Sequence, residues 1–286
     1  MSKMKKVIGL MMALSLTVSA FSVTPKTVEA KAATYNIQNV TDLGTGKTVT
    51  KTWTNKDHKE AYYSFKLKKN GYTSFSVTKP SVDGFVSEER VAILDKKGKE
   101  VWVTDTQKLD KNDATKVSFK VGLKKGNYYL CVQPEFMTVM SGQSGQTKIS
   151  LSTKADANFE VESNNTKKTA NTLKLGKTKK GVFCEEYDWK KTKNPTGDDW
   201  YKVKVKKGTK YKVTLKNNKK LKKNGRTTLV YILNENQKSE YRYGYDLVQK
   251  GTVTFKATKT GYYYIRLWND GQHSSTDYQL KVEKKK

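Results

Sequence analysis

The sequence predicts an all-β protein built from two tandem jelly-roll-like antiparallel β-sandwich domains that follow a signal peptide. Three observations predict this fold. Short runs of alternating polar and apolar residues lie between Gly, Lys-Asn and Asp-Lys turns, and no long stretch has the helical period. The two halves of the chain repeat one pattern of strands. The 17 Tyr and 9 Phe supply the large side chains that thin sandwich cores need.

The first 32 residues have the pattern of a secretory signal peptide. Lysines open the chain, an apolar run follows from Val7 to about Val23, and Ala30 and Ala32 end two candidate cleavage sites. No cysteine lies near these sites and no apolar tail ends the chain, so we expect neither a lipid anchor nor a membrane span. The leader predicts a secreted, extracellular protein.

Residues 33–154 are expected to form the first sandwich. The runs in this half that alternate as strands do are AYYSFKL, YTSFSV, VAILD, EVWVT, KVSFKV, NYYLCV and KISLS. Many short, evenly spaced strands are typical of a sandwich or a barrel.

Residues 158–286 are expected to form the second sandwich, as a copy of the first. Its strand runs are WYKVKV, KYKVTL, TLVYIL, TVTFKA, YYYIRLW and YQLKVE. Ala61–Val77 aligns without a gap over Asp199–Leu215, and Lys116–Val132 aligns over Thr252–Trp268 with one slipped residue. A repeat of this length indicates a duplicated domain and not a solenoid.

Four motifs follow one another in the second half. They are E-x-E-x-N-N at Glu160–Asn165, LxLG at Leu173–Gly176, DDWYKVKVKKGTKY at Asp198–Tyr211 and TGYYYIRL at Thr260–Leu267. In this order they resemble the bacterial pre-peptidase C-terminal domain, a jelly-roll sandwich that includes the collagen-binding domains of clostridial collagenases. The resemblance spans Asn158 to Glu283 and implies the same fold.

Oxygen-bearing side chains gather at two places in the second half, and calcium takes about six to eight oxygens in loose geometry. The resemblance implies that both groups close on one or two Ca²⁺ ions. The implied ligands are Glu160, Glu162, Asn164, Asn165, Asp198 and Asp199. An acidic linker whose oxygens face water is the alternative. The first half has Ala61 in place of Asp199 and lacks the acidic run, so we expect a copy of the fold without the metal site.

Outward-facing aromatic residues in the last strands favour a recognition face. Strand alternation separates Tyr263, Ile265 and Leu267, which are expected in the core, from their neighbours. The candidate ligand-binding residues are Tyr264, Arg266, Trp268, Tyr241 and Tyr243. Aromatic rings beside a cation stack on sugar rings or pack on extended peptide. A face covered by a loop or by the other domain is the alternative.

The chain offers no good candidate for a catalytic base, so we expect no enzymatic activity. A hydrolase needs a nucleophile, a base and an orienting group in one place, and the only histidines, His58 and His273, lie in different halves. Glu185, Glu186 and Asp188 form an acidic cluster of the kind that a glycosidase uses. In lysine-rich proteins, however, such clusters usually neutralise their neighbours.

The formal charge of +29 comes almost wholly from lysine. Lysine suits diffuse attraction to anionic surfaces, whereas base recognition relies on arginine, so nucleic acid is not expected. The expected partners of a monomeric chain are an extracellular polysaccharide, an anionic cell-wall polymer or a fibrous, collagen-like protein. Lysines that solvate outer strand faces are the plainer alternative.

The expected function is therefore non-catalytic attachment to an extracellular polymer. The alternative is an accessory or targeting subunit of a secreted peptidase or other hydrolase encoded elsewhere. Cys131 and Cys184 fall one in each half. A disulfide between them would join the two domains, and two separate thiols are the other possibility.

Overall fold

The computed structural model describes residues 35–54, 60–78, 81–82, 85–86, 89–105, 116–134, 144–183, 198–217, 227–233, 239–246, 250–269 and 276–285. Strands make up most of these residues, which confirms the predicted all-β fold class. A short 3-10 turn, η2 (Lys167–Thr169), is capped by Thr166. Within these ranges no helix has the length and apolar character that crossing a bilayer requires.

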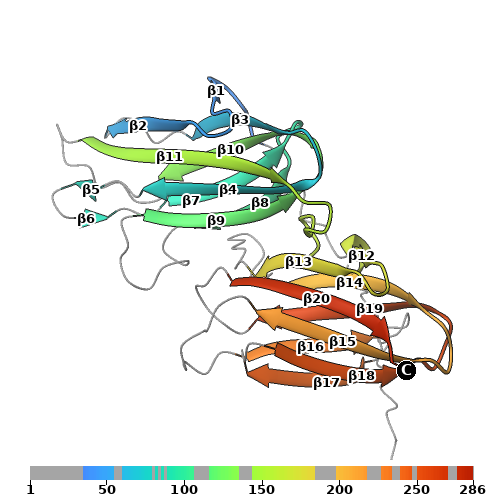
Figure 1. The fold of residues 1–286 in the computed structure, drawn as a ribbon. Coiled ribbons are helices and arrows are strands. Elements are labelled where there is room, and N and C mark those ends of the chain that lie inside the picture. Colours follow the sequence, from blue (N-terminus) through green and yellow to red (C-terminus); the bar gives the residue numbers. More distant parts are fainter. Residues whose placement is uncertain are drawn as a thin grey trace, which may run out of the picture. The chain divides into compact units, whose positions relative to one another are not determined.

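The first pair of sheets, which we call the first sandwich, has a five-stranded layer in the order β1-β3-β10-β7-β8 and a four-stranded layer in the order β2-β11-β4-β9 (Figure 1). Its strands are β1 (Thr41–Asp42), β2 (Thr48–Thr54), β3 (Ala61–Leu67), β4 (Gly71–Thr78), β7 (Glu89–Asp95), β8 (Glu100–Asp105), β9 (Lys116–Leu123), β10 (Gly126–Pro134) and β11 (Ser144–Ala155). A small hairpin joins β5 (Ser81–Val82) to β6 (Phe85–Val86).

The second pair of sheets, the second sandwich, has layers in the orders β12-β14-β19-β16-β17 and β13-β20-β15-β18. Its strands are β12 (Asn171–Leu173), β13 (Thr178–Phe183), β14 (Asp198–Val205), β15 (Lys210–Asn217), β16 (Thr227–Leu233), β17 (Ser239–Asp246), β18 (Lys250–Lys256), β19 (Gly261–Asn269) and β20 (Thr276–Lys284).

The two sandwiches have the same strand order. In the five-stranded layers β12 takes the place of β1, β14 of β3, β19 of β10, β16 of β7 and β17 of β8. In the four-stranded layers β13, β20, β15 and β18 replace β2, β11, β4 and β9. Even the parallel pairing of β1 with β3 recurs, as β12 with β14. The internal repeat in the sequence is therefore a repeat of topology.

Alternating burial places a separate core between the two layers of each sandwich. In β14 every second residue, from Asp199 to Val205, is buried. Aromatic rings fill much of both cores: Phe75 stacks on Phe119 at 5.0 Å between ring centroids, and Tyr211 stacks on Phe255 at 5.5 Å. The predicted core residues of β19 are confirmed, since Tyr263, Ile265 and Leu267 are all buried.

The described chain begins as a strap over the outer face of the first five-stranded layer. The amide of Tyr35 donates to the carbonyl of Gly98 at 3.2 Å. Tyr35 and Ile37 then pack on a buried outer cluster, whose members are Tyr62, Ala92, Leu94, Val103 and Cys131. Cys131 is buried and forms no disulfide. Cys184 and the predicted signal peptide lie outside the described residues.

Candidate functional site

The segment that leads into the second sandwich pairs with the edge of β13. The amide of Glu160 donates to the carbonyl of Lys180, and the amide of Lys180 donates to the carbonyl of Asn158, both at 2.8 Å. This backbone pairing turns the side chain of Glu160 into the sandwich, where the residue is only 1% exposed.

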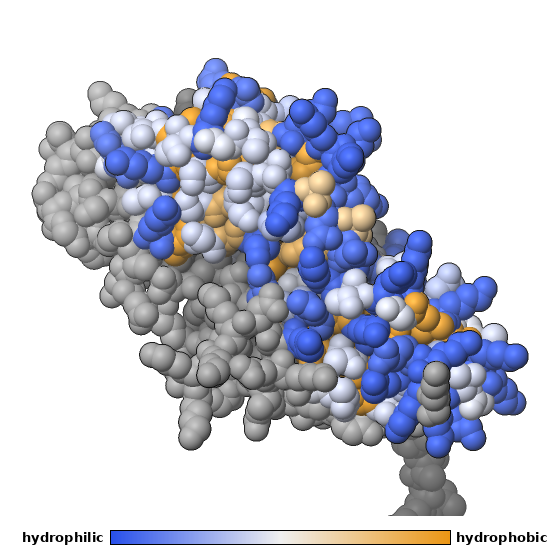
Figure 2. All heavy atoms as spheres, viewed as in Figure 1, coloured by the Kyte–Doolittle hydropathy of each residue, from blue (hydrophilic) through white to orange (hydrophobic). Residues whose placement is uncertain are grey.

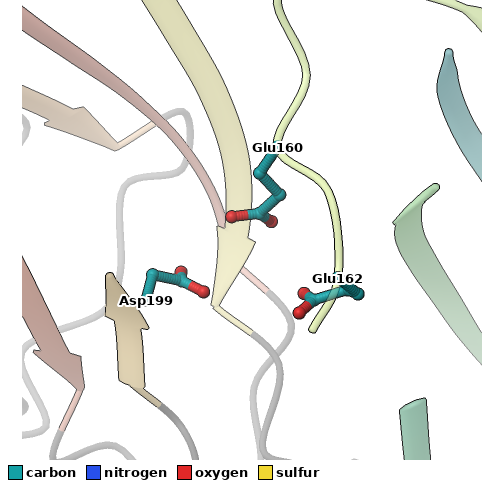
Figure 3. Close-up of side chains that lie close together, drawn as sticks. All are labelled: Glu160, Glu162 and Asp199. Atoms are coloured by element: carbon teal, nitrogen blue, oxygen red, sulfur yellow. The ribbon is translucent and has the colours of Figure 1, made fainter. Parts of the chain in front are cut away.

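Three carboxylates meet at the end of the second core that this segment closes. Glu160, Glu162 and Asp199 each place a carboxylate oxygen within 4.8 Å of the others. Figure 3 shows the three side chains converging, two from the incoming segment and one from β14. Glu160 and Asp199 are buried and Glu162 is half-buried. We call this group the acidic cluster.

Two buried phenols complete the floor of the acidic cluster. Tyr201 and Tyr278 lie 2.9 and 2.7 Å from Oε2 of Glu160, and Tyr278 also lies 2.6 Å from Oδ2 of Asp199. The two hydroxyls also contact each other. The other oxygen of Glu160 accepts the amide of Val182 at 2.6 Å. Because Tyr278 has one hydroxyl proton, it can donate to only one of its acceptors at a time.

A glycine makes room for this arrangement. Gly181 of β13 pairs directly with Tyr278 of β20. A Cβ atom at this position would overlap the tyrosine ring and would lie 2.5 Å from Oε2 of Glu160. No other residue type fits here without moving the cluster.

The acidic cluster brings negatively charged carboxylates together in a buried place. Burial raises the pKa of Glu160, and hydrogen bonds from Tyr278, Val182, Tyr201 and Asn164 oppose that rise. Burial and the neighbouring carboxylates raise the pKa of both tyrosines, so the phenols stay protonated and act as donors. Carboxylates this close repel one another unless a cation or a proton lies between them.

Asn164 adds an unsatisfied oxygen to the acidic cluster. The residue is fully buried, and its side-chain Oδ1 has no hydrogen-bond partner. Its Nδ2 lies 3.4 Å from Oε2 of Glu160, which keeps the carboxamide beside the cluster. Its backbone carbonyl accepts the amide of Trp200 at 2.8 Å. A buried acceptor without a donor is costly, and a cation would satisfy it. Carboxylate and amide oxygens are the ligands that calcium takes, so the donor set fits this ion.

The two aspartates of β14 do not act together. Asp199 faces the core and belongs to the acidic cluster, whereas Asp198 faces the opposite side of the sheet. Oδ2 of Asp198 accepts Nε and Nη2 of Arg266 at 2.8 and 2.6 Å. The implied ligand set is wrong at Asp198, because neighbouring residues of a strand point to opposite faces. Asn165 follows Asn164 and is half-buried.

The outer face of the second five-stranded layer carries a row of aromatic residues around Arg266. Trp200, Arg266 and Tyr231 lie side by side on β14, β19 and β16. The guanidinium lies 5.8 Å from the Trp200 ring centroid and 5.4 Å from that of Tyr231. Nearby, the Lys167 ammonium lies 4.7 Å from the ring of Tyr264. All three residues of the row and Tyr264 are partly exposed.

The remaining candidate ligand-binding residues are placed only by backbone register. Trp268 pairs with Asp198, which puts its position on the outer face. Tyr241 pairs with Ile232, and Tyr243 with Val230. The expected grouping of Tyr241 and Tyr243 with Tyr264 and Arg266 stays a prediction.

Neither feature recurs in the first sandwich. In the first sandwich, the positions equivalent to Trp200, Arg266 and Tyr231 hold Tyr62, Cys131 and Ala92. These three residues lie beneath the strap.

The end of the first sandwich that corresponds to the acidic cluster is closed by a neutral pair. Nε1 of Trp53 on β2 donates to Oγ1 of Thr147 on β11 at 2.7 Å. Thr147 pairs with Lys51, at the place in the register where Tyr278 pairs with Gly181. No acidic cluster forms at this end among the residues that the structure describes.

The sequence interpretation missed several residues that build the acidic cluster and the aromatic row. These residues are Tyr201, Tyr278, Gly181, Trp200 and Tyr231. Alternation in DDWYKVKV already places Asp199 and Tyr201 on one face and Trp200 on the other. Gly181 interrupts an otherwise lysine-rich run, which was the available signal for a close approach. His58, His273, Glu185, Glu186 and Asp188 lie outside the described residues.

No protein-family model matches the chain, and no curated protein matches it either. Among solved structures, the pre-peptidase C-terminal domain of a Bacillus anthracis collagenase has 13% identity and a TM-score of 0.30, over 41% of this chain and 98% of that chain. Aeromonas hydrophila PliG, a periplasmic lysozyme inhibitor, has 9% identity and a TM-score of 0.27, over 40% and 97%. The M60 catalytic domain with two CBM51 domains of Clostridium perfringens ZmpB has 9% identity and a TM-score of 0.24, over 79% and 34%. Values this low say nothing about function.

Proposed function

We propose that this chain is a secreted, non-catalytic binding protein that attaches to an extracellular polymer through its second sandwich. The row of Trp200, Arg266 and Tyr231 is the observation that carries the proposal. Two aromatic rings and a cation lie side by side on a regular sheet, and Asp198 fixes the guanidinium between them. Rigid aromatic residues with a polar partner are typical of recognition surfaces.

The contrast with the first sandwich supports this reading. There the equivalent row of Tyr62, Cys131 and Ala92 is buried and covered by the strap, so it has the character of a packed layer. In the second sandwich the row stays partly exposed, and Tyr262 at the far end of the face is 44% exposed. The same strand positions thus serve packing in one copy and are available to a ligand in the other.

Calcium is the proposed stabiliser of this second sandwich, which the resemblance of its motifs to the pre-peptidase C-terminal domain implies. Glu160, Glu162, Asn164 and Asp199 would hold the ion. When bound, calcium would neutralise the acidic cluster and satisfy Oδ1 of Asn164. It would also tie the incoming segment to β14, because the ligands come from both.

Retention of the protein on insoluble polymers tests the binding function. Chitin, cellulose, isolated cell walls and fibrillar collagen are each incubated with the protein in millimolar calcium, and the bound fraction is measured. Trp200→Ala combined with Tyr264→Ala should lower the affinity for the retaining polymer by about tenfold or more, because two stacking contacts are removed.

Lys204→Ala is the matched control, since Lys204 is exposed on the same face of β14. This variant should bind as the unchanged protein does, and thermal unfolding shows whether each variant is folded. Absence of retention on all four materials would overturn the proposal. So would retention that the two aromatic substitutions leave unchanged.

A further inference from the structure

The outer face of the four-stranded layer of the second sandwich is a field of lysines. In β15 the buried residues alternate with Lys210, Lys212 and Lys216. The lysines with described side chains on this face are Lys180, Lys210, Lys212, Lys216, Lys256 and Lys281. The other described outward residues of β15, β18 and β20 are threonines, Gln279, Asp277 and Glu283. We call this surface the lysine face.

Two lysines stand directly opposite each other across neighbouring strands of this layer. They are Lys210 of β15 and Lys256 of β18. Like charges directly opposite destabilise a sheet. Folding therefore gives no reason for this placement.

Few carboxylates neutralise the lysine face. Glu283 accepts both Lys212 and Lys281, at 2.7 and 2.6 Å. Lys180 pairs with Asp156 at 2.9 Å, and Asp277 pairs with Lys120 at 2.6 Å. Lys210, Lys216 and Lys256 form no ion pair with any residue that the structure describes.

The first sandwich shows that the fold does not need these lysines. The positions equivalent to Lys212, Lys216 and Lys281 hold the hydroxyl residues Ser74, Thr78 and Ser150, although Lys116, Lys148 and Lys154 are exposed elsewhere on the same layer. Ser150 and Ser76 lie 2.7 Å apart between their hydroxyl oxygens. Figure 2 shows the difference: the face over β20, β15 and β18 is crowded with strongly hydrophilic side chains, whereas the face over β11, β4 and β9 carries many pale ones.

Protection of sheet edges does not explain the lysine face either. Lysines on edge strands discourage unwanted pairing between sheets, and β18 and β13 are the edges of this layer. Lys210, Lys212, Lys216 and Lys281, however, lie on the central strands β15 and β20. Their charge has to serve something other than the edge.

We propose that the lysine face binds a linear phosphodiester polymer with one charge per repeat, of the poly(alditol phosphate) kind. Same-face residues along a strand are about 6.8 Å apart, and neighbouring strands are about 4.8 Å apart. Two strand residues contain six backbone bonds, and so does one glycerol phosphate repeat, so successive phosphates match successive outward positions. On β15 three of four such positions are lysines, at Lys210, Lys212 and Lys216. Lysine contacts phosphate as a point charge, which tolerates small errors in spacing.

The composition of the face separates this polymer from a nucleic acid, whose backbone also has six bonds per repeat. Single-stranded nucleic acids bind to aromatic residues on which their bases stack. The described outward residues of the lysine face include no aromatic residue. The face thus fits a phosphodiester chain without bases. This inference rests on the proposed function only in placing the protein outside the cell.

The test measures the affinity for poly(glycerol phosphate) as a function of salt. The triple variant Lys210→Gln, Lys216→Gln and Lys256→Gln should bind about tenfold more weakly at low salt. Its slope of log affinity against log salt should be smaller by about 2, because fewer counterions are released. The matched control is Lys116→Gln, Lys148→Gln and Lys154→Gln, which removes the same charge from exposed positions of the equivalent layer in the first sandwich. This control should stay within about twofold of the unchanged protein.

Three results would overturn the inference: equal weakening in both triple variants, tighter binding to polygalacturonate than to poly(glycerol phosphate), or tighter binding to single-stranded DNA. The aromatic variant tests the proposed function and the lysine variant tests this inference, so the two can fail separately. Loss of polyanion binding in the lysine variant, with no retention of any protein on the four insoluble polymers, would sink the proposed function and leave this inference standing.

Discussion

Gly181 of β13 lies directly opposite Tyr278 of β20, and the space that its missing side chain leaves holds the tyrosine ring and the carboxylate of Glu160. The equivalent position of the first sandwich is Lys51, opposite Thr147. Gly181 is therefore one of the residues that let this sandwich end hold an acidic cluster, together with Asp199, whose counterpart in the first sandwich is Ala61.

Gly181→Ala should destabilise the second sandwich by about 1–3 kcal/mol, because the added methyl group overpacks the ring of Tyr278. Denaturant unfolding followed by tyrosine fluorescence measures the change. Thr178→Ala, an outward position on the same strand, is the control and should cost less than about 0.5 kcal/mol. Equal costs in the two variants would mean that the space at Gly181 is not needed.

Calcium should raise the melting temperature of the protein in a concentration-dependent way. At a free concentration about a hundredfold above the Kd, the gain is about 2.7 kcal/mol if the ion binds only the folded state. Glu162→Gln should remove most of this gain, as should Asp199→Asn.

Asp198→Asn is the control for the calcium prediction, because Asp198 pairs with Arg266 on the other face of the same strand. This variant should keep the calcium response. Two outcomes contradict the assigned site: no response at millimolar calcium, or a response that Asp198→Asn abolishes and Asp199→Asn preserves.

Lys256→Glu should stabilise the second sandwich while weakening polyanion binding. The substitution replaces a like-charge pair opposite Lys210 with an ion pair, a gain of about 0.2–1 kcal/mol. Lys256→Gln should fall between the two, since it removes repulsion without adding attraction. Thermal unfolding at low salt is the measurement, and a lower melting temperature for Lys256→Glu would show that the lysine pair does not strain the sheet.

Glu283 should titrate far below an ordinary glutamate. Hydrogen bonds from Lys212 and Lys281 lower its pKa to about 2. A lowered pKa means that the contribution of Glu283 to stability is present above about pH 4.5 and is lost as the pH falls toward 2. Carbon-detected NMR titration of the carboxyl group measures the midpoint. Lys212→Gln should move it upward, and a midpoint near 4 in the unchanged protein would contradict the shared ion pair.

Alternation was enough to predict most strands and the duplication. AYYSFKL matches the full length of β3, and WYKVKV lies within β14. Strands β2, β12 and β13 were among those not predicted, because polar residues and lysines hide their inward positions. Gly181 adds to the difficulty in β13, since its role is to contribute no side chain. Such a residue is recognised only when its neighbours across the sheet are known.

Register was the main source of error. The sequence alignment matches Phe119 with Phe255, and it matches Phe75 with Val213. In the structure Phe119 pairs with Phe75. Phe255, however, pairs with Tyr211, two residues before Val213. A slip of two residues preserves the inward and outward pattern, so alternation cannot detect it.

The hydrogen bond between Trp53 and Thr147 has a consequence for how the molecule responds to its surroundings. It joins two uncharged groups, so neither acid nor divalent ions act on it directly. Calorimetry of the whole chain should then resolve two transitions, one that moves with calcium and one that stays. The transition that does not move with calcium is then an internal reference within the same polypeptide. Shifts in the melting temperature of the second sandwich can be measured relative to it.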